Sequence, residues 1–499
     1  MRVATRAAVI MVSRGLMQLC TIILAVVLVR VISKDLYGTY RQVILLVGLV
    51  EGIFLANIAS SLFYFLPAGD RQRRPVVLAQ TLLVSLVVGG LAAVVLLVGS
   101  EPISRLFASN DLLGSSLRVF CLYVVFRAVL SVVTPFMVSL DRPVRAGIYA
   151  VVGTVLRVGL TTYGFVTGWS IEATLLLAMA GEALLMVVAA VDMFRLCRGG
   201  TWGVEFSLLW EQVSYVWPLC LTSGIALLSR RLDQALISAT FETSDYAVYA
   251  CGAMELPVMS LVVSSISTAL MPSLVEMGRE GRIPNALSLW QNGARKAALV
   301  IFPCFAFCLF HARDIMVLLY GEGFARAAWP FAVYLFLLPL HITIYGTFFR
   351  AMGETRPITV AGIIALVSNI SISSFLIWLG RGSLLSFVGP AVGTVCCAVL
   401  STAYKARVMS RLARVRMLRV LPVRELACLM SVSVGSCAVF LIPSPVVMPK
   451  WAVLIAHAGM YLAAVLGVLV GFRMLRTDEL RLLGPVGAWI ERLYARRGS

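Results

Sequence analysis

The sequence predicts an all-α, polytopic membrane protein with about 14 transmembrane helices, and three observations predict it. Of the 499 residues, 60% are hydrophobic and only 13% are charged, whereas a soluble domain is about 25% charged. Fourteen apolar runs reach the ~20 residues that a spanning helix needs, and only short connections separate them. The basic residues collect in alternate connections, as they do in membrane proteins.

Taken in order, the predicted spans lie near residues 5–31, 37–66, 76–99, 116–140, 146–167, 170–196, 212–239, 246–272, 287–310, 326–349, 358–379, 384–404, 424–442 and 451–472. The first run has no small-residue cleavage site, so we interpret it as an uncleaved span and not as a signal peptide. Two runs, 37–66 and 212–239, exceed the minimum length and are expected to tilt or to extend beyond the bilayer. No connection is long enough to fold as an independent domain.

The charge distribution fixes the predicted topology. With the N-terminus inside, 26 lysines and arginines fall on the cytoplasmic side, and six fall on the other: Arg30, Lys34, Arg105, Arg313, Arg381 and Lys450. This bias follows the positive-inside rule through every alternation and places both termini in the cytoplasm. It also accounts for most of the net charge of +18 without a nucleic-acid partner.

An internal repeat divides the first twelve spans. The stretch SKDLYGTYRQ (33–42) has a weaker counterpart in TSDYAVYACG (243–252), and SLDRPVRAG (139–147) matches GETRPITVAG (353–362). The offsets, 210 residues from Asp35 to Asp245 and 214 from Arg142 to Arg356, agree closely. We therefore expect two six-helix lobes related by an axis along the membrane normal, with a cavity between them. Gly38 is expected to let the chain reverse between spans one and two.

Residues typical of metal, cofactor or nucleotide chemistry do not form patterns. The eleven cysteines are scattered through apolar runs without a C-x-x-C pair, and the three histidines lie on separate spans or at their ends. We interpret the cysteines as small buried hydrophobes. There is no glycine-rich phosphate loop and no pair of carboxylates in a long outer loop. No metal, no cofactor and no enzymatic activity are therefore expected.

Three motifs, together with the order of the spans, carry a family resemblance. They are ISKDLYGTYRQ after the first span, LLYGEGFARAAWPFAVY (318–334) before the tenth, and RAMGETRP (350–357) after it. Along nearly the whole chain the pattern resembles the multidrug/oligosaccharidyl-lipid/polysaccharide exporter superfamily, in particular its lipid-linked oligosaccharide flippases, which export O-antigen or exopolysaccharide units.

The resemblance implies a V of two lobes around a cavity bordered by spans 1, 2, 7 and 8. The corresponding regions are 1–200 for the N-terminal lobe, 201–407 for the C-terminal lobe, 408–475 for two additional spans and 476–499 for an amphipathic cytoplasmic tail. It also implies a bacterial inner-membrane flippase, which turns undecaprenyl-diphosphate-linked glycan from the inner to the outer leaflet for cell-surface polysaccharide biosynthesis. Its expected partners are this lipid-linked glycan, membrane lipids, a polysaccharide polymerase and glycosyltransferases.

Charged residues inside spans that border the implied cavity are the candidate substrate-binding residues, because an ionised side chain in hydrocarbon is costly and often functional. Arg14 lies two turns into span one, with Gln18 on the same face, and Arg41 lies one turn into span two. Guanidinium groups are suited to paired hydrogen bonds with a diphosphate. The alternative is that Arg14 and Arg41 extend to the two membrane interfaces.

Spans seven and eight carry the other candidates. Arg230 and Arg231 point roughly 100° apart, so one of them is expected to face inward, and Asp233 is expected to neutralise one of the two. Glu51 and Glu255 are candidates for pairing with the cavity arginines or for carrying a proton.

Other intramembrane cations are not counted among the candidates. Arg118 and Arg127 are nine residues apart, hence on opposite faces of one helix, so at most one of them can face the cavity. Arg157 is expected to pair with Glu182 or Asp192 inside the first lobe. Arg295, Lys296 and Arg326 lie near helix ends and are expected to extend to the interface.

The expected function is alternating-access flipping, coupled to the membrane potential, H⁺ or Na⁺. One alternative is a multidrug or cation antiporter of the same superfamily, whose site should favour carboxylates over arginines. The alternative from another class is an integral-membrane polysaccharide polymerase or ligase, which would need a large outer loop.

Overall fold

The computed structural model describes residues 3–55, 57–68, 71–107, 110–254, 256–441, 449–472 and 474–480. Throughout this part of the chain the regular elements are helices, as the sequence predicts. Twelve helices among the described residues are long and apolar enough to cross a membrane, and there are 14 such spans if two bent pairs each count as one. The predicted all-α polytopic fold class is confirmed.

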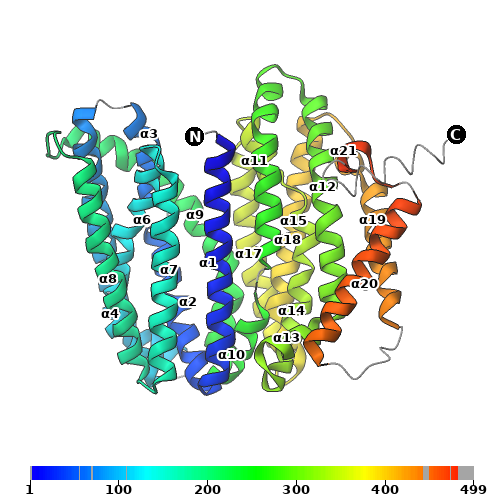
Figure 1. Cartoon of the computed structure of the whole chain (residues 1–499), viewed down its shortest axis with the longest axis horizontal. Helices are drawn as coiled ribbons and strands as arrows, with labels where there is room; N and C mark the ends of the chain where they lie inside the picture. Colours follow the sequence, from blue (N-terminus) through cyan, green and yellow to red (C-terminus); the bar gives the residue numbers. More distant parts are fainter. Residues whose placement is uncertain are drawn as a thin grey trace. The chain divides into compact units, whose positions relative to one another are not determined.

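Two compact units make up the chain, the first comprising Met1–Ala253 and Gly362–Cys397, the second Met254–Ala361 and Ala398–Ser499. The helices up to the first boundary are α1 (Val3–Val31), α2 (Lys34–Phe54), η1 (Ile58–Ser60), α3 (Ser61–Ala68), η2 (Arg71–Arg73), α4 (Arg74–Leu106), α5 (Asp111–Phe120), α6 (Tyr123–Ser139), α7 (Pro143–Val166), α8 (Ile171–Leu196), α9 (Phe206–Thr240) and α10 (Thr243–Gly252). Within the first unit, α4, α6, α7 and α8 run side by side (Figure 1).

The remaining helices are α11 (Pro257–Arg279), α12 (Ile283–Phe310), α13 (Ala312–Tyr320), η3 (Glu322–Ala327), α14 (Ala328–Leu335), α15 (Leu337–His341), α16 (Tyr345–Ala351), α17 (Arg356–Leu379), α18 (Leu384–Leu412), η4 (Met417–Arg419), α19 (Val423–Gly435), η5 (Ser436–Leu441), α20 (Lys450–Gly471) and α21 (Thr477–Leu480). Of the predicted tail at 476–499, residues 481–499 lie outside the described residues.

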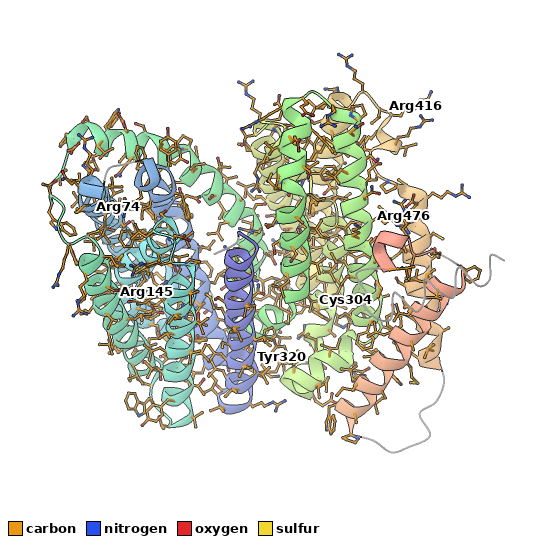
Figure 2. All side chains as sticks on the ribbon, turned by 45° about the horizontal axis from the view of Figure 1, so that its top comes forward. Arg74, Arg145, Cys304, Tyr320, Arg416 and Arg476 are labelled. Carbon is orange, nitrogen blue, oxygen red and sulfur yellow. The ribbon has the colours of Figure 1, made fainter. Side chains whose placement is uncertain are left out.

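Local chemistry explains where several helices begin. The Ser33 side chain accepts a hydrogen bond from the Leu36 N–H and caps α2, and Ser170 caps α8 in the same way through Ala173. Pro143 lies in the first turn of α7, where its missing N–H has no partner to lose. The cationic residues Arg74 and Arg145 lie in the first turns of α4 and α7 (Figure 2).

Two predicted spans are broken. The second span ends as α2 and resumes after Asn57, whose φ of 64° is left-handed, a conformation that asparagine tolerates better than most residues. The Asn57 amide donates to the backbone oxygen of Leu219 and to the Ser223 hydroxyl on α9. The fourth span bends by 47° between α5 and α6. Arg118 and Arg127 therefore lie on two different helices, and not on opposite faces of one helix as their nine-residue spacing predicts.

Each unit has an apolar core, mostly aliphatic in the first unit and aromatic-rich in the second. In the first unit, Phe136, Met137 and Met193 are fully buried with Leu62 between α3, α6 and α8. In the second, Trp290, Tyr345 and Phe348 are packed between α12 and α16. These cores hold α8 and α12 in place, and the same two helices carry Glu182 and Arg295.

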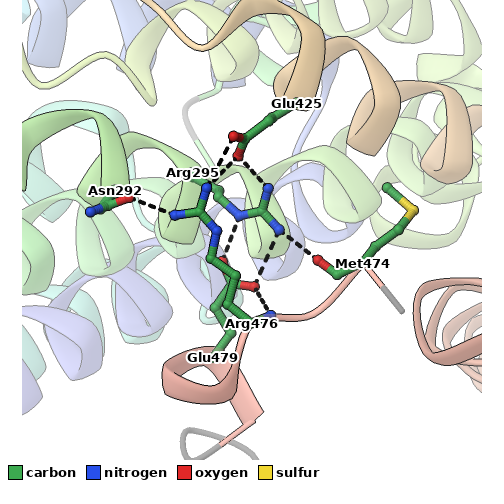
Figure 3. A network of polar contacts seen from close by, with 6 residues as sticks. All are labelled: Asn292, Arg295, Glu425, Met474, Arg476 and Glu479. Atoms are coloured by element: carbon green, nitrogen blue, oxygen red, sulfur yellow. Dashed lines mark hydrogen bonds and ion pairs between the residues drawn. The ribbon is translucent and has the colours of Figure 1, made fainter. Parts of the chain in front are cut away.

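A saturated ion network lies in the second unit, around Arg295 on α12 (Figure 3). The Arg295 guanidinium pairs with Glu425 on α19 and with Glu479 on α21, and it also donates to the Met474 backbone oxygen at 2.6 Å. Arg476 joins the network through Glu425 at 2.9 Å and Asn292 at 2.7 Å. The Arg295 side chain is only 8% exposed. Arg295 was expected to extend to the membrane interface, and in the structure two carboxylates distant in sequence hold its guanidinium, the half-buried Glu425 and the buried Glu479.

Candidate functional site

The two segments that the repeat relates, the start of α2 and α10, pack against each other in the first unit. A Cβ on Gly38 would lie 2.2 Å from the Thr243 backbone oxygen, so only glycine permits this approach. Gly38 lies inside α2 and is not among the residues with positive φ. The expectation that Gly38 reverses the chain is wrong, because the chain turns before the Ser33 cap.

Arg41 lies one turn further into α2 and is half-buried. Its Nη2 donates to the Ala250 backbone oxygen at 3.4 Å, and the Tyr246 hydroxyl donates to the Arg41 backbone oxygen at 3.3 Å. The Tyr249 hydroxyl, also on α10, donates to Asp233 Oδ2 at 2.9 Å. The structure therefore brings two of the predicted site residues, Arg41 and Asp233, into contact with α10.

A cavity of about 160 Å³ opens beside Arg41 within the first unit. Residues of α1, α2, α6 and α7 line it, among them Arg41, Glu51, Tyr40, Tyr123 and Arg157. A polar cavity between helices of membrane-spanning length is unusual, because hydrocarbon does not solvate charged groups. We refer to it as the arginine cavity.

Two ion pairs border the arginine cavity. Arg127 Nε contacts Glu51 Oε1 at 3.1 Å. Arg157 Nη1 donates to the Tyr123 hydroxyl at 2.7 Å and lies 3.6 Å from Glu182 Oε1, whose side chain is 2% exposed. Three arginines, Arg41, Arg127 and Arg157, and two carboxylates, Glu51 and Glu182, thus lie at or beside the cavity.

The predicted pairing of Arg157 with Glu182 is confirmed, whereas Asp192, the other predicted candidate, contacts Arg145 at 3.1 Å. Glu51 was expected to pair with the cavity arginines or to carry a proton, and its ion-pair partner is Arg127. Arg118 is exposed and pairs with Glu101 at 3.2 Å.

The other candidates lie as follows. On α1, Arg14 is exposed and Gln18 is half-buried. On α9, Arg230 and Arg231 are both exposed, and Arg231 Nη1 donates to Gln234 Oε1 at 3.4 Å. Asp233 is fully buried and accepts a hydrogen bond from the Tyr249 hydroxyl at 2.9 Å. Glu255 lies outside the described residues.

Sequence reasoning did not place Tyr40, Tyr123 or Arg127 at the site. The two tyrosines belong to apolar runs and carry no local signal of their own. Arg127 lies on α6, after the break at Cys121–Leu122, and it contacts Glu51 of α2.

Solved structures with the same fold include a lipid II flippase and transporters of the MOP superfamily. The lipid II flippase MurJ in an inward closed conformation superposes with a TM-score of 0.76 at 13% identity, over 94% of this chain and 99% of that one. An inward-facing multidrug resistance MATE family transporter of the MOP superfamily gives 0.64 at 14% identity, over 80% and 96%. A MOP superfamily transporter from Pyrococcus furiosus, described as having a binding pocket of reverse polarity, gives 0.57 at 15% identity, over 82% and 96%. At such identities the likeness establishes the fold alone.

The fold is therefore that of the MOP-superfamily transporters, which confirms the predicted resemblance. A search of curated proteins finds no match. A family model described as polysaccharide biosynthesis protein matches residues 27–328, and the chain belongs to that family.

Proposed function

We propose that the protein is a flippase that moves undecaprenyl-diphosphate-linked oligosaccharide from the inner to the outer leaflet of the bacterial inner membrane. The single observation that carries the proposal is the arginine cavity inside a polysaccharide-biosynthesis protein whose helices are long enough to span a bilayer. The diphosphate is the part of such a lipid that needs cations, and guanidinium groups bind it with paired, charge-assisted hydrogen bonds.

The transport cycle follows the two-lobe plan. Residues 1–200 and 201–407 form six-helix lobes that alternate access to a shared path, 408–475 add two spans, and 476–499 form a cytoplasmic tail. The prenyl tail stays in the bilayer while the diphosphate passes from Arg14 towards Arg41 and the arginines of α9. Outward movement of an anion follows an inside-negative potential, which supplies about 2.3 kcal/mol per charge per 100 mV. Coupling to H⁺ or Na⁺ is the alternative driving force.

Glycosyltransferases supply the lipid-linked unit, and a polymerase consumes it on the outer side. Both termini are cytoplasmic in this scheme. The protein itself forms and breaks no covalent bond.

The test is export of surface polysaccharide by cells that carry Arg41→Ala. Loss of one charge-assisted hydrogen-bond donor should reduce the export rate about tenfold or more. Arg105→Ala is the matched control, because Arg105 is an exposed arginine at the end of α4 that contacts Glu101. Membrane levels of each variant are measured by immunoblot.

Full export by Arg41→Ala at normal protein level would overturn the proposal. The cation-antiporter alternative predicts a different pattern: efflux of a lipophilic cationic dye that depends on Glu51, with surface polysaccharide unchanged.

A further inference from the structure

A second and larger cavity lies in the first unit, apart from the arginine cavity. Its volume is about 560 Å³, and residues of α2, η1, α3, α4 and α9 line it. Val84, Val88 and Leu91 of α4 face Val216, Trp217 and Leu221 of α9 across it. We call it the α4–α9 groove. The lining is apolar apart from Ser61, Cys220 and Gln212, and a volume of this order is that of a typical small-molecule site.

Gln212 is the exception that points to a ligand. Gln212 is 3% exposed, and neither its amide nitrogen nor its amide oxygen has a hydrogen-bond partner among the described residues. Buried polar side chains in native proteins are nearly always hydrogen-bonded, so an unpaired amide in an apolar wall indicates a missing partner. The last torsion of a glutamine side chain has a broad minimum, which lets the amide turn towards the groove.

The position of Gln212 gives the groove a polar end. It lies two turns from the start of α9, close to where Gln80 of α4 donates to the Glu205 backbone oxygen at 2.7 Å. The opposite wall continues along α4 through Leu91, and α4 and α9 are both long and apolar enough to cross a membrane. The groove therefore joins one buried polar amide to an apolar wall between two helices of membrane-spanning length.

We propose that the α4–α9 groove binds one acyl chain of a glycerophospholipid, with the Gln212 amide nitrogen donating to an ester carbonyl oxygen. The neutral Gln212 amide favours an ester-linked lipid over a prenyl diphosphate. A prenyl diphosphate needs cations at its polar end, whereas an ester carbonyl needs only a hydrogen-bond donor. None of the described residues that line the groove is an arginine or a lysine. The inference does not depend on which lipid the protein transports.

The test uses the purified full chain in nanodiscs of phosphatidylethanolamine and phosphatidylglycerol that contain a diazirine-acyl phosphatidylethanolamine. After irradiation, cross-linked peptides are mapped by mass spectrometry. The expected result is labelling of residues 212–228 and 84–91. Val88→Phe should fill the groove and reduce that labelling about tenfold. Val87→Phe is the matched control, because Val87 is 63% exposed and does not line the groove.

Gln212→Leu provides a second variant that preserves side-chain volume and should therefore fold. It should reduce groove labelling severalfold while labelling elsewhere on α9 stays constant. A parallel arm uses diazirine-tagged undecaprenyl phosphate. Groove labelling by the prenyl probe and not by the acyl probe would overturn the proposal. So would equal labelling of the Val87→Phe and Val88→Phe variants.

Discussion

Two arginine clusters, one in each unit, differ in burial and in the number of partners that each guanidinium contacts. Arg295 in the second unit contacts two carboxylates and a backbone oxygen, and its side chain is 8% exposed. Arg157 in the first unit contacts one hydroxyl and one carboxylate, is 27% exposed and borders the arginine cavity. The first arrangement joins α12, α19 and α21, and the second borders an open cavity. An intramembrane arginine therefore acquires a role from its surroundings and not from its depth alone.

The largest expected effect comes from breaking the saturated cluster. Arg295→Ala leaves Glu479, whose side chain is 2% exposed, as an uncompensated buried charge. The free energy of unfolding should fall by about 3–5 kcal/mol. Thermal unfolding in detergent measures it, with the exposed Arg118→Ala as control. A decrease in the free energy of unfolding below about 1 kcal/mol would show that the network does not stabilise the fold.

The next effect concerns the close approach of α2 and α10. Gly38→Ala places a Cβ against the Thr243 backbone oxygen, which no side-chain movement relieves. Overpacking of this kind should cost about 1–3 kcal/mol. Gly48→Ala is the matched control in the same helix, since nothing lies within 4 Å of its Cβ position. Equal thermal stability of the two variants would contradict the packing role of Gly38.

A double-mutant cycle tests whether Glu51 and Arg127 act as a pair in the arginine cavity. Glu51→Gln and Arg127→Gln should each destabilise the protein, and the double variant should recover part of the loss. The coupling energy should be about 0.5–3 kcal/mol, from unfolding measured on all four proteins. Additive losses would mean that the 3.1 Å contact contributes no coupling.

The smallest effect is expected at the exposed pair of Arg118 and Glu101. Both side chains are more than half exposed, so water screens their attraction and the pair contributes about 0–1 kcal/mol. The free energy of unfolding of Arg118→Ala should therefore equal that of the wild type within that range. A larger decrease in the free energy of unfolding would show that an exposed arginine stabilises the fold as well, so that burial would not distinguish Arg295 from Arg118.

The spans could be predicted from the sequence because hydropathy and the positive-inside rule report on each segment separately. Helix continuity could not, because the breaks at Asn57 and at Cys121–Leu122 depend on local backbone conformation inside apolar runs. The pairing of Arg157 with Glu182 could be predicted because their spans are close in sequence. The partners of Arg295 lie 130 and 184 residues away, beyond any local pattern. The sequence predicts a turn at Gly38 from the conformational freedom of glycine. In the structure Gly38 instead permits close packing against Thr243, which lies 205 residues away.

The central claim is that the arginine cavity receives a diphosphate. Its most direct test is the affinity of the purified protein for undecaprenyl diphosphate in nanodiscs, measured for the wild type, Arg41→Ala and Arg105→Ala. The account predicts about tenfold or more weaker binding for Arg41→Ala and unchanged binding for Arg105→Ala. Wild-type affinity in Arg41→Ala, with the variant folded, would contradict it.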